Sequence, residues 1–324
     1  MSTKNDLFKL LSEHQGDYVS GQYAGDTLNV SRNAIWKAVT QLRDEGYNIE
    51  SSPKVGYRLA GSGNMLTEEA IWADLQRDCD LKVFSEIDST NNYAMQAEIG
   101  SKPLLVVADK QTAGRGRNGR SFISPSGTGL YLSIAFRPDF DVSKALFVTM
   151  AAAVAVCRSI ESVCGVSGEI KWVNDVFAGG KKVCGILTEA KTNFETGRID
   201  SLIIGIGINC FPGNFPDELK DIAGPVSMEP DSFSRSRLAA AIFDNTMALA
   251  DDIMSRSFFD EYKRRCFILG RQITVHPNLN DVSIPAIAMD IDEDGGLMIK
   301  YLGGPKQGET DHLTTGEVSI AVKG

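Results

Sequence analysis

The sequence predicts an α+β protein in three parts: a small helical unit, a central mixed α/β region and a C-terminal region of short strands. Residues 1–62 show helical periodicity followed by two short strand-like runs. Residues 63–269 contain longer apolar runs typical of strands and helices, and residues 270–324 contain only short strands and turns. We therefore expect three domains with these bounds, the first two joined by a linker at Gly61–Asn64.

The N-terminal unit has an order of elements that is typical of a winged helix-turn-helix. Helices are expected around Leu7–Leu11, over Ser20–Thr27, and from an N-cap at Ser31 to Gly46. Two strands then flank a turn at residues 51–56. Polar side chains of the third helix lie off its apolar stripe, where contacts to DNA bases and phosphates would form. The residues expected to contact DNA are Ser31, Arg32, Asn33, Trp36, Lys37 and Lys54.

Because the basic and acidic residues of this unit balance, its role has two interpretations. It contains seven Lys/Arg and seven Asp/Glu, so it is not basic overall. A winged helix can bind DNA, or it can dock onto another protein. The motif and the placement of its basic side chains both favour DNA.

The composition of the whole chain narrows the classes of function. The formal net charge of −9 repels polyanions at long range, so any nucleotide site must be built from local positive groups. The longest apolar run, Ala145–Val163, is interrupted by Arg158 and Glu161, and the N-terminus lacks the apolar segment of a signal peptide. We therefore expect a cytoplasmic protein without a membrane partner. The six cysteines include no Cys-x-x-Cys pair, so no metal site is expected.

Apolar runs define the expected elements of the central and C-terminal regions. Central strands are expected at Leu104–Ala108, Leu130–Phe136, Val183–Leu187 and Leu202–Ile208. Helices are expected at Thr67–Leu75, Ala145–Val163, Arg235–Ile253 and Phe258–Cys266. The spacing of a small β-barrel is found in the C-terminal strands, expected at Gln272–His276, Ser283–Asp290, Leu297–Tyr301 and Val318–Val322.

A loop of glycines and arginines, Gly114–Arg120, is the most informative motif. Its glycines allow positive φ angles and close approach of the backbone to a ligand. The guanidinium groups of Arg115, Arg117 and Arg120 match phosphate or carboxylate oxygens. The motif predicts a mobile loop that closes over a small polyanion. A solvated basic turn and an arginine-rich nucleic-acid patch are the alternative interpretations.

Polar or glycine-containing segments near the ends of other expected strands indicate a site for a polar ligand. Asp88–Asn92 opens a helix and also fits a simple N-cap box. Lys171–Asp175 ends a short strand and also fits an Asn-Asp turn. Gly185 and the glycines of Gly205–Asn209 lie inside strands, which indicates close backbone approach or tight sheet packing. Gln111 stands just before the arginine loop.

In this order, and over essentially the whole chain, these segments resemble the motifs of the biotin–protein ligases. With the N-terminal helix-turn-helix and the C-terminal barrel, the chain is similar to the bifunctional members that also repress the biotin operon. The resemblance implies a central domain like that of class II synthetases and an SH3-like C-terminal barrel. Three positions depart from the usual motifs: Asn118 stands where the family has arginine, Phe122 where it has tryptophan, and Val173 where it has proline.

The resemblance implies a reaction in two steps. The carboxylate of biotin attacks the α-phosphorus of Mg²⁺-ATP to give biotinyl-5′-AMP and pyrophosphate, and a lysine of a biotin carboxyl carrier protein then takes the biotinyl group and releases AMP. ATP with Mg²⁺ and biotin would be substrates, and no permanently bound cofactor is expected. Biotinyl-5′-AMP would also be the co-repressor that brings a homodimer onto operator DNA. Fixed cations suit this chemistry, because the nucleophile is the substrate's own carboxylate.

The resemblance also assigns roles to residues. The catalytic residues would be Arg115, Arg117 and Lys171. The residues that would bind biotin are Ser89, Thr90, Asn91, Gln111, Arg115, Gly116, Arg117, Lys171 and Gly185. Those that would bind ATP or the adenylate are Arg117, Arg120, Lys171, Asn174 and Asn209. Asp175 would orient or deprotonate the incoming lysine.

Two other functions remain open at the level of sequence. A lipoate–protein ligase-like enzyme would share the central fold and mechanism, although a different glycine-rich loop is expected in it. A non-catalytic transcription factor would use the central region only to sense a metabolite, although Lys171 and the loop arginines argue against this. Biotin-dependent exchange between ATP and pyrophosphate would separate a ligase from a sensor.

Overall fold

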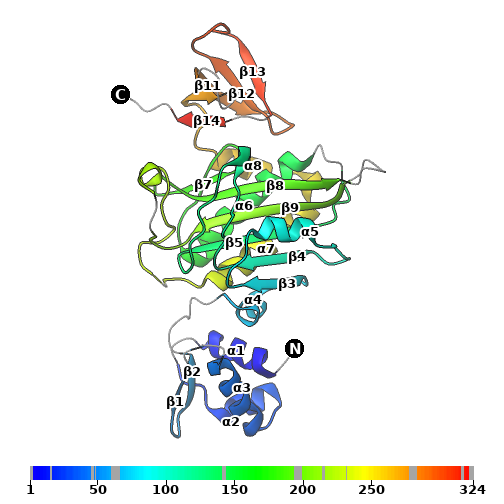
Figure 1. Ribbon diagram of the computed structural model, residues 1–324, viewed down its shortest axis with the longest axis vertical. Helices are drawn as coiled ribbons and strands as arrows, with labels where there is room; N and C mark the ends of the chain where they lie inside the picture. The colour runs from blue at the N-terminus through cyan, green and yellow to red at the C-terminus, as the bar shows by residue number, and fades with distance from the viewer. Residues whose placement is uncertain are drawn as a thin grey trace.

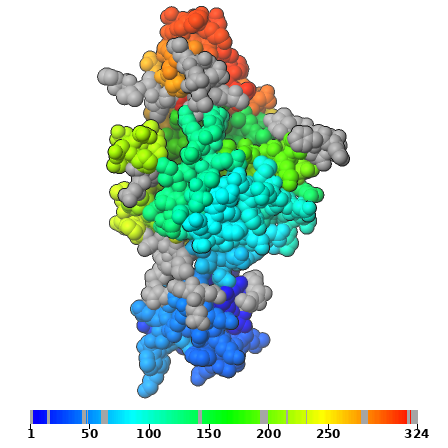
Figure 2. All heavy atoms as spheres, viewed as in Figure 1, coloured from blue at the N-terminus to red at the C-terminus, as the bar shows by residue number. Residues whose placement is uncertain are grey.

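The computed structural model describes residues 3–14, 17–44, 47, 49–59, 66–140, 144–192, 199–213, 216–230, 232–276, 283–314 and 317–320. The predicted three-part architecture is confirmed, because a helical unit, a central sheet with helices and a C-terminal sheet follow one another along the molecule (Figure 1). The space-filling view shows the N-terminal unit and the C-terminal sheet at opposite ends of an elongated body (Figure 2). The domain bounds stay predictions, and the predicted linker Gly61–Asn64 lies outside the described residues.

The N-terminal unit folds around the apolar stripes seen in the sequence. Its elements are α1 (Thr3–Glu13), α2 (Gly21–Leu28), α3 (Arg32–Asp44), β1 (Ile49–Ser52) and β2 (Gly56–Leu59). One core contains the buried side chains of Leu7, Leu11, Ile35 and Leu42. Ser20 caps α2, because its hydroxyl oxygen accepts a hydrogen bond from Tyr23 N, and Ser31 caps α3 in the same way. Gly46, the predicted end of the third helix, lies outside the described residues.

The β1–β2 hairpin forms the wing of this unit. Its strands pair antiparallel with Ser52 opposite Gly56, so that Lys54 lies in the turn. Gly56 has a φ of 136°, and a Cβ at this position would overlap the backbone of Val19. A glycine is therefore required where the wing passes the body of the unit.

The central region is built on a mixed sheet of seven strands. In spatial order these are β3 (Asp80–Phe84), β4 (Leu104–Ala108), β5 (Gly129–Phe136), β9 (Ile199–Asn209), β8 (Lys181–Thr192), β7 (Asp175–Ala178) and β6 (Glu169–Lys171). The β3–β4 pair is parallel, and the other five pairs are antiparallel. The four strands predicted from apolar runs are confirmed. Two others, β3 and β7, were not predicted, because β3 is an edge strand with charged Asp80 and Lys82 and β7 has only four residues.

Helices cover both faces of this sheet. On one face, α6 (Ala145–Cys164) packs against α7 (Arg235–Asp251), and α5 (Thr90–Gln96) lies on the other face, over β4, β5 and β9 (Figure 1). By length and composition α6 could cross a membrane, but 72% of that stretch is buried inside the structure, which accounts for its apolar character. The shorter α8 (Phe259–Arg265) buries Tyr262 against the core.

The C-terminal region is a five-stranded antiparallel sheet. Its spatial order is β13 (Thr310–Leu313), β12 (Leu297–Tyr301), β11 (Ile284–Ile291), β10 (Gln272–His276) and β14 (Glu317–Ile320). The predicted all-β character is confirmed, β13 is an additional strand, and residues 321–322 of the last predicted strand lie outside the described residues. The apolar side chains of this sheet continue the central core, and Trp172 Nε1 donates a hydrogen bond to Gly295 O at 3.0 Å. The sheet therefore packs directly on the central region.

A seven-residue helix, α4 (Glu68–Asp74), connects the N-terminal unit to the central region. Ala70 belongs to the N-terminal core, whereas its neighbour Ile71 is buried in the central core. On the N-terminal side, Lys4 Nζ lies 2.7 Å from Glu69 Oε1. The helix is therefore shared by the two parts of the molecule.

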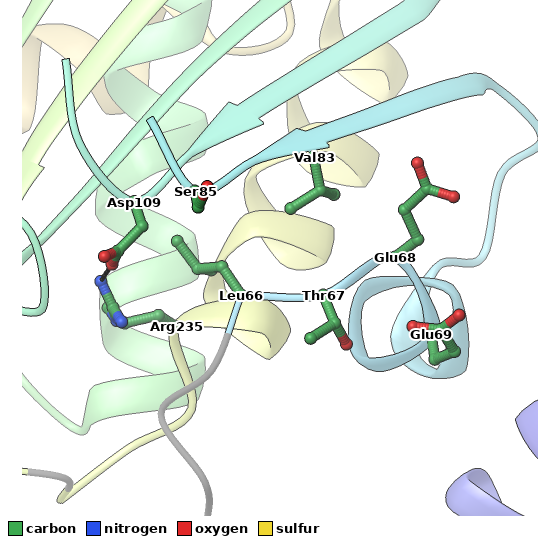
Figure 3. Close-up of a pocket in the computed structure, with 8 residues that line it drawn as sticks. All are labelled: Leu66, Thr67, Glu68, Glu69, Val83, Ser85, Asp109 and Arg235. Atoms are coloured by element: carbon green, nitrogen blue, oxygen red, sulfur yellow. Dashed lines mark hydrogen bonds and ion pairs between the residues drawn. The ribbon is translucent and has the colours of Figure 1, made fainter. Parts of the chain in front are cut away.

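A hollow of about 440 Å³ lies beside α4 (Figure 3). Its lining residues are Leu66, Thr67, Glu68, Glu69, Val83, Ser85, Asp109 and Arg235. The Thr67 hydroxyl is hydrogen-bonded to Tyr47 of the N-terminal unit, and the dashed line in Figure 3 marks the contact between Asp109 and Arg235. Because its main polar groups already bind other parts of the chain, this hollow is a structural junction.

The ion pair between Arg235 and Asp109 ties α7 to the end of β4. Arg235 is only 4% exposed, and its Nη1 lies 2.6 Å from Asp109 Oδ1 and 2.7 Å from Gly129 O. Burial raises the pKa of Asp109, but hydrogen bonds from Ser126 and Arg235 outweigh it and hold that pKa below its ordinary value. The pair therefore stabilises the fold at neutral pH, and this stabilisation is lost as the pH falls through the lowered pKa.

We predict that Arg235→Ala lowers the free energy of unfolding by about 3–5 kcal/mol, because it leaves the Asp109 carboxylate partly buried without its cation. Urea unfolding at pH 7 measures this change. The matched control is Arg237→Ala, an exposed arginine two residues along the same helix, which should change the free energy by less than about 0.5 kcal/mol. Equal unfolding midpoints for the two variants would contradict this account of the junction.

Candidate functional site

A pocket of about 560 Å³ lies on the sheet face that carries α5. It is lined by all twelve residues that the sequence assigned to the ligand site: Ser89, Thr90, Asn91, Gln111, Arg115, Gly116, Arg117, Arg120, Lys171, Asn174, Gly185 and Asn209. These residues come from six separate segments of the chain. The structure therefore brings the whole predicted set together, while the role of each residue toward a ligand stays a prediction.

Glycines paired across β8 and β9 form the floor of the pocket. Gly185 lies opposite Gly207 in the antiparallel register, and both line the cavity. A Cβ on Gly207 would overlap the Phe122 ring, and a Cβ on Gly205 would overlap the Asn91 carboxamide. The glycines are thus required for close approach of these two side chains, and both halves of the sequence interpretation, close approach and tight packing, hold.

A buried polar network stands at the α5 end of the pocket. Ser89 caps α5 through its hydroxyl, so the N-cap interpretation of this segment is correct. Gln111 Oε1 accepts hydrogen bonds from Thr90 N at 2.8 Å and Thr90 Oγ1 at 3.2 Å. Ser133 Oγ lies 2.7 Å from Thr90 Oγ1 and 2.5 Å from Asn91 Oδ1. The same side chains can therefore serve the fold and present polar atoms to a ligand.

The arginine loop closes on itself and on the pocket wall. Gly116 N donates to Arg120 O at 2.7 Å, and a short 3-10 turn, η1 (Arg117–Gly119), forms between them. Arg117 Nη1 donates to Asn174 Oδ1 at 3.0 Å, which draws the loop toward the strand that follows Lys171. Asn118 has a φ of 56°, a conformation that asparagine tolerates better than arginine, which gives a physical reason for this departure from the family motif. Mobility of the loop without ligand stays a prediction.

Two cations face the pocket from the β6–β8 side. Lys171 lines the cavity as predicted, and Lys182, which was not predicted, also lines it. Lys182 Nζ lies 2.6 Å from Asp175 Oδ1, so the carboxylate expected to act on an incoming lysine is paired with an internal one. The signal in the sequence was the Gly179-Gly180 turn, which folds β8 back along β7 and returns Lys182 to Asp175.

The other lining residues that were not predicted come from distant parts of the chain. His276 and Val318 of the C-terminal sheet form part of the wall. Cys184 also contributes, and burial raises the pKa of its thiol well above the ordinary value, so that it remains protonated at neutral pH. A protonated thiol is a poor nucleophile, which fits a reaction whose nucleophile arrives with the substrate.

The residues expected to contact DNA lie in the N-terminal unit, at the end of the molecule opposite the C-terminal sheet (Figure 1). All six, Ser31, Arg32, Asn33, Trp36, Lys37 and Lys54, are exposed. Trp36 is 56% exposed, whereas Ile35 and Val39 of the same helix are buried in the core. The polar face of α3 is therefore available to a partner, with Lys54 on the adjacent wing.

Two protein families match the chain. Residues 83–209 match the Biotin/lipoate A/B protein ligase family, which contains both biotin and lipoate ligases by its description. Residues 3–58 match the HTH domain family. The two matches cover the pocket strands and the N-terminal unit respectively.

One relative over nearly the whole chain and two solved structures over about three-quarters of it are more specific. The bifunctional ligase/repressor BirA of Bacillus spizizenii is 42% identical over 94% of this chain and 96% of its own. The biotin protein ligase from Aquifex aeolicus, solved in complex with biotin and ATP, has a TM-score of 0.61 and 26% identity over 75% of this chain and 99% of its own. The ligase from Leishmania major, solved with biotinyl-5-AMP, shares the fold with a TM-score of 0.52, at 22% identity over 74% of this chain and 100% of its own. The chain therefore belongs to the family of bifunctional biotin–protein ligases and biotin-operon repressors.

Proposed function

We propose that the pocket joins biotin to AMP and then passes the biotinyl group to a lysine of a biotin carboxyl carrier protein. The observation that carries this proposal is the convergence of twelve predicted residues in one cavity, with a polar network at one end and arginines and lysines around the other parts. The buried hydroxyl and amide groups of α5 and Gln111 suit the ureido ring of biotin. A site whose buried polar groups pair with a ligand discriminates strongly against analogues that lack the partner atoms.

In the first step, a carboxylate oxygen of biotin forms a bond to the α-phosphorus of ATP, and the bond from that phosphorus to the pyrophosphate oxygen breaks. Both reactants are anions, so their approach requires positive charge. Arg115, Arg117, Lys171 and Lys182 provide this charge at fixed positions, which is the arrangement that stabilises a transition state most effectively. Mg²⁺ enters on the phosphates of ATP as part of that substrate.

In the second step, the neutral amine of the carrier lysine attacks the acyl carbon, and AMP leaves with the electrons of the acyl–phosphate bond. The nitrogen releases one proton to solvent as the amide forms. Asp175 holds Lys182 at 2.6 Å, so we assign Asp175 the role of positioning that cation beside the phosphate. His276 and Val318 of the C-terminal sheet line the pocket, and we propose that a carrier domain delivers its lysine along this wall.

We further propose that the adenylate is the signal for repression. The N-terminal unit carries equal numbers of basic and acidic residues, so one copy has no net charge and binds DNA weakly. Two copies related by a two-fold axis would read two half-sites and double the contacts. Biotinyl-5′-AMP acts as co-repressor if it favours the dimer, and operator DNA must then tighten adenylate binding in return. ATP, carrier protein and operator are all found in the cytoplasm, where we expect this protein to work.

The alternatives make different claims about the same pocket. Lipoate–protein ligation is less well supported, because the ligase from Aquifex aeolicus, which is 26% identical over 75% of this chain, is a biotin protein ligase by name. A non-catalytic sensor would not need five cationic side chains around the cavity. Both alternatives are tested by the experiments that follow.

The full-length protein, incubated with biotin, Mg²⁺-ATP and a biotin carboxyl carrier domain, should add the mass of one biotinyl group to a single carrier lysine. Mass spectrometry of the intact carrier and of its peptides detects this change. Lipoate in place of biotin is the matched control and should give no product. Lipoyl transfer without biotinyl transfer would support the lipoate alternative, and no transfer of either would support the sensor.

Lys171→Ala and Lys182→Ala should each lower biotin-dependent ATP–pyrophosphate exchange by about 10²–10³-fold, because each removes a preorganised positive group from the pocket. Circular dichroism should show an unchanged fold. Lys102→Ala, a half-exposed lysine paired with Asp78 far from the cavity, is the control and should keep the exchange rate. A variant of either pocket lysine with nearly normal exchange would remove that lysine from the mechanism.

Arg32→Ala and Lys37→Ala should each weaken operator binding and lower the slope of log affinity against log salt by about one, because each removes a phosphate contact. Ligase activity should not change, since both side chains lie outside the pocket. Lys9→Ala on the exposed side of α1 is the control for net charge.

In the unsubstituted protein, biotin with ATP should tighten operator binding; equal affinity with and without them would exclude adenylate as the co-repressor.

A further inference from the structure

Glu189 stands at the place where the buried polar network meets the arginine loop. It lies on β8 opposite Ile203, and its side chain is 25% exposed. A single oxygen, Oε2, accepts hydrogen bonds from Asn91 Nδ2 at 2.8 Å and from Arg115 Nη2 at 3.0 Å. One carboxylate thus joins α5 to the first arginine of the loop.

The same network reaches the other flank of the loop. From Thr90 it passes to Gln111, whose Nε2 donates to Ser124 Oγ at 3.0 Å. Ser124 Oγ in turn donates to Phe122 O at 3.0 Å. The loop is therefore attached to one polar network at both ends, and Glu189 makes the attachment at the arginine end.

The charge of Glu189 is not needed for the contact with Asn91. An amide donor is satisfied by a neutral oxygen as well as by an anionic one, whereas a guanidinium binds a carboxylate more strongly than a neutral acceptor. The Arg115 side chain is 43% exposed and has five N–H donors, so that donors remain for a second anion. The nearby Asp88 carboxylate accepts a hydrogen bond from Asn92 at 2.9 Å, which lowers its pKa, and the charge of Arg115 adds a smaller lowering.

We propose that Glu189 is a positioning residue, whose negative charge holds Arg115 at the biotin end of the pocket and thereby fixes the loop over the ligand. Glu189 does not contact the reacting atoms in this role. It acts through Arg115, which keeps its other donors for the carboxylate of biotin and for the adenylate. The identity of the ligand rests on the proposed function, whereas the contact by which Glu189 positions Arg115 and the loop does not depend on it.

The substitution that isolates the charge is Glu189→Gln, which keeps an oxygen acceptor for Asn91. In the ligand-free protein, amide hydrogen exchange of residues 114–122 should become about fivefold faster or more. With ligand, the KM for biotin and the release rate of biotinyl-5′-AMP should both rise about 5–10-fold. This change corresponds to a free energy between that of an exposed ion pair and that of a hydrogen bond to a charged group. The KM for ATP and the thermal midpoint should stay nearly constant. Glu86→Gln, which removes the carboxylate paired with exposed Lys110, is the matched control and should change none of these quantities.

A double-mutant cycle with Arg115→Ala tests whether Glu189 acts through that arginine. In the Arg115→Ala background, Glu189→Gln should change the biotin KM less than twofold. An equal effect in both backgrounds, or unchanged loop exchange in the single Glu189→Gln variant, would overturn the proposal. The exchange measurement needs no ligand, so it decides the role of Glu189 even if the pocket binds something other than biotin. Failure of the proposed function would appear instead as absent biotinyl transfer by the unsubstituted protein.

Discussion

The antiparallel register of β8 and β9 is the constraint on which the ligand site depends. It sets Gly185 opposite Gly207 and brings Gly205 into the same face, so that three neighbouring positions of the pocket floor carry no side chain. A shift of one residue would turn these glycines to the face that carries α6 and α7 and turn the side chains of neighbouring isoleucines toward α5, because side chains alternate along a strand. The positions of Asn91 and Phe122 depend on the same register. Asn91 occupies the space that a Cβ on Gly205 would fill, and Phe122 occupies the space that a Cβ on Gly207 would fill.

The polar side chains above this floor both stabilise the fold and line the ligand site. Thr90, Asn91 and Ser133 are buried and bonded to one another, which holds α5 against the sheet and fixes their orientation before a ligand arrives. The cations stand around this rigid part on the loop, at the end of β6 and on β8. In a protein with a net charge of −9, such a local cluster is what makes the pocket attractive to an anion, and the acidic surface elsewhere discourages nonspecific binding.

Much of the site could be predicted from the sequence, because its main residues lie in short motifs at strand ends. The spacing of Gly114–Arg120 already indicated close backbone approach to a ligand, and the glycines of β8 and β9 indicated close backbone approach or tight sheet packing. Glu189 was not predicted, because its contacts with Asn91 and Arg115 join residues that are distant in the sequence. Lys182 was not predicted although it meets Asp175 across the short β7–β8 hairpin, because the register of a hairpin is not evident from the local pattern alone. His276 reaches the pocket only because the C-terminal sheet packs on the central core. Short or charged strands such as β3 and β13 were not predicted for another reason: they bury too little apolar surface to give a periodic pattern in the sequence.

The division of α4 between two cores has a geometric consequence. Ala70 and Ile71 are consecutive, yet one is packed among the helices of the N-terminal unit and the other beneath the central sheet. A helix is stiff over seven residues, so these two contacts, together with Lys4 and Glu69, fix the angle between α3 and the sheet. In a two-fold dimer formed through the central regions, the distance between the two α3 helices would then be a property of packing on α4. The spacing of the DNA half-sites that such a dimer can read would be encoded in the interior of the protein, far from any residue that touches DNA.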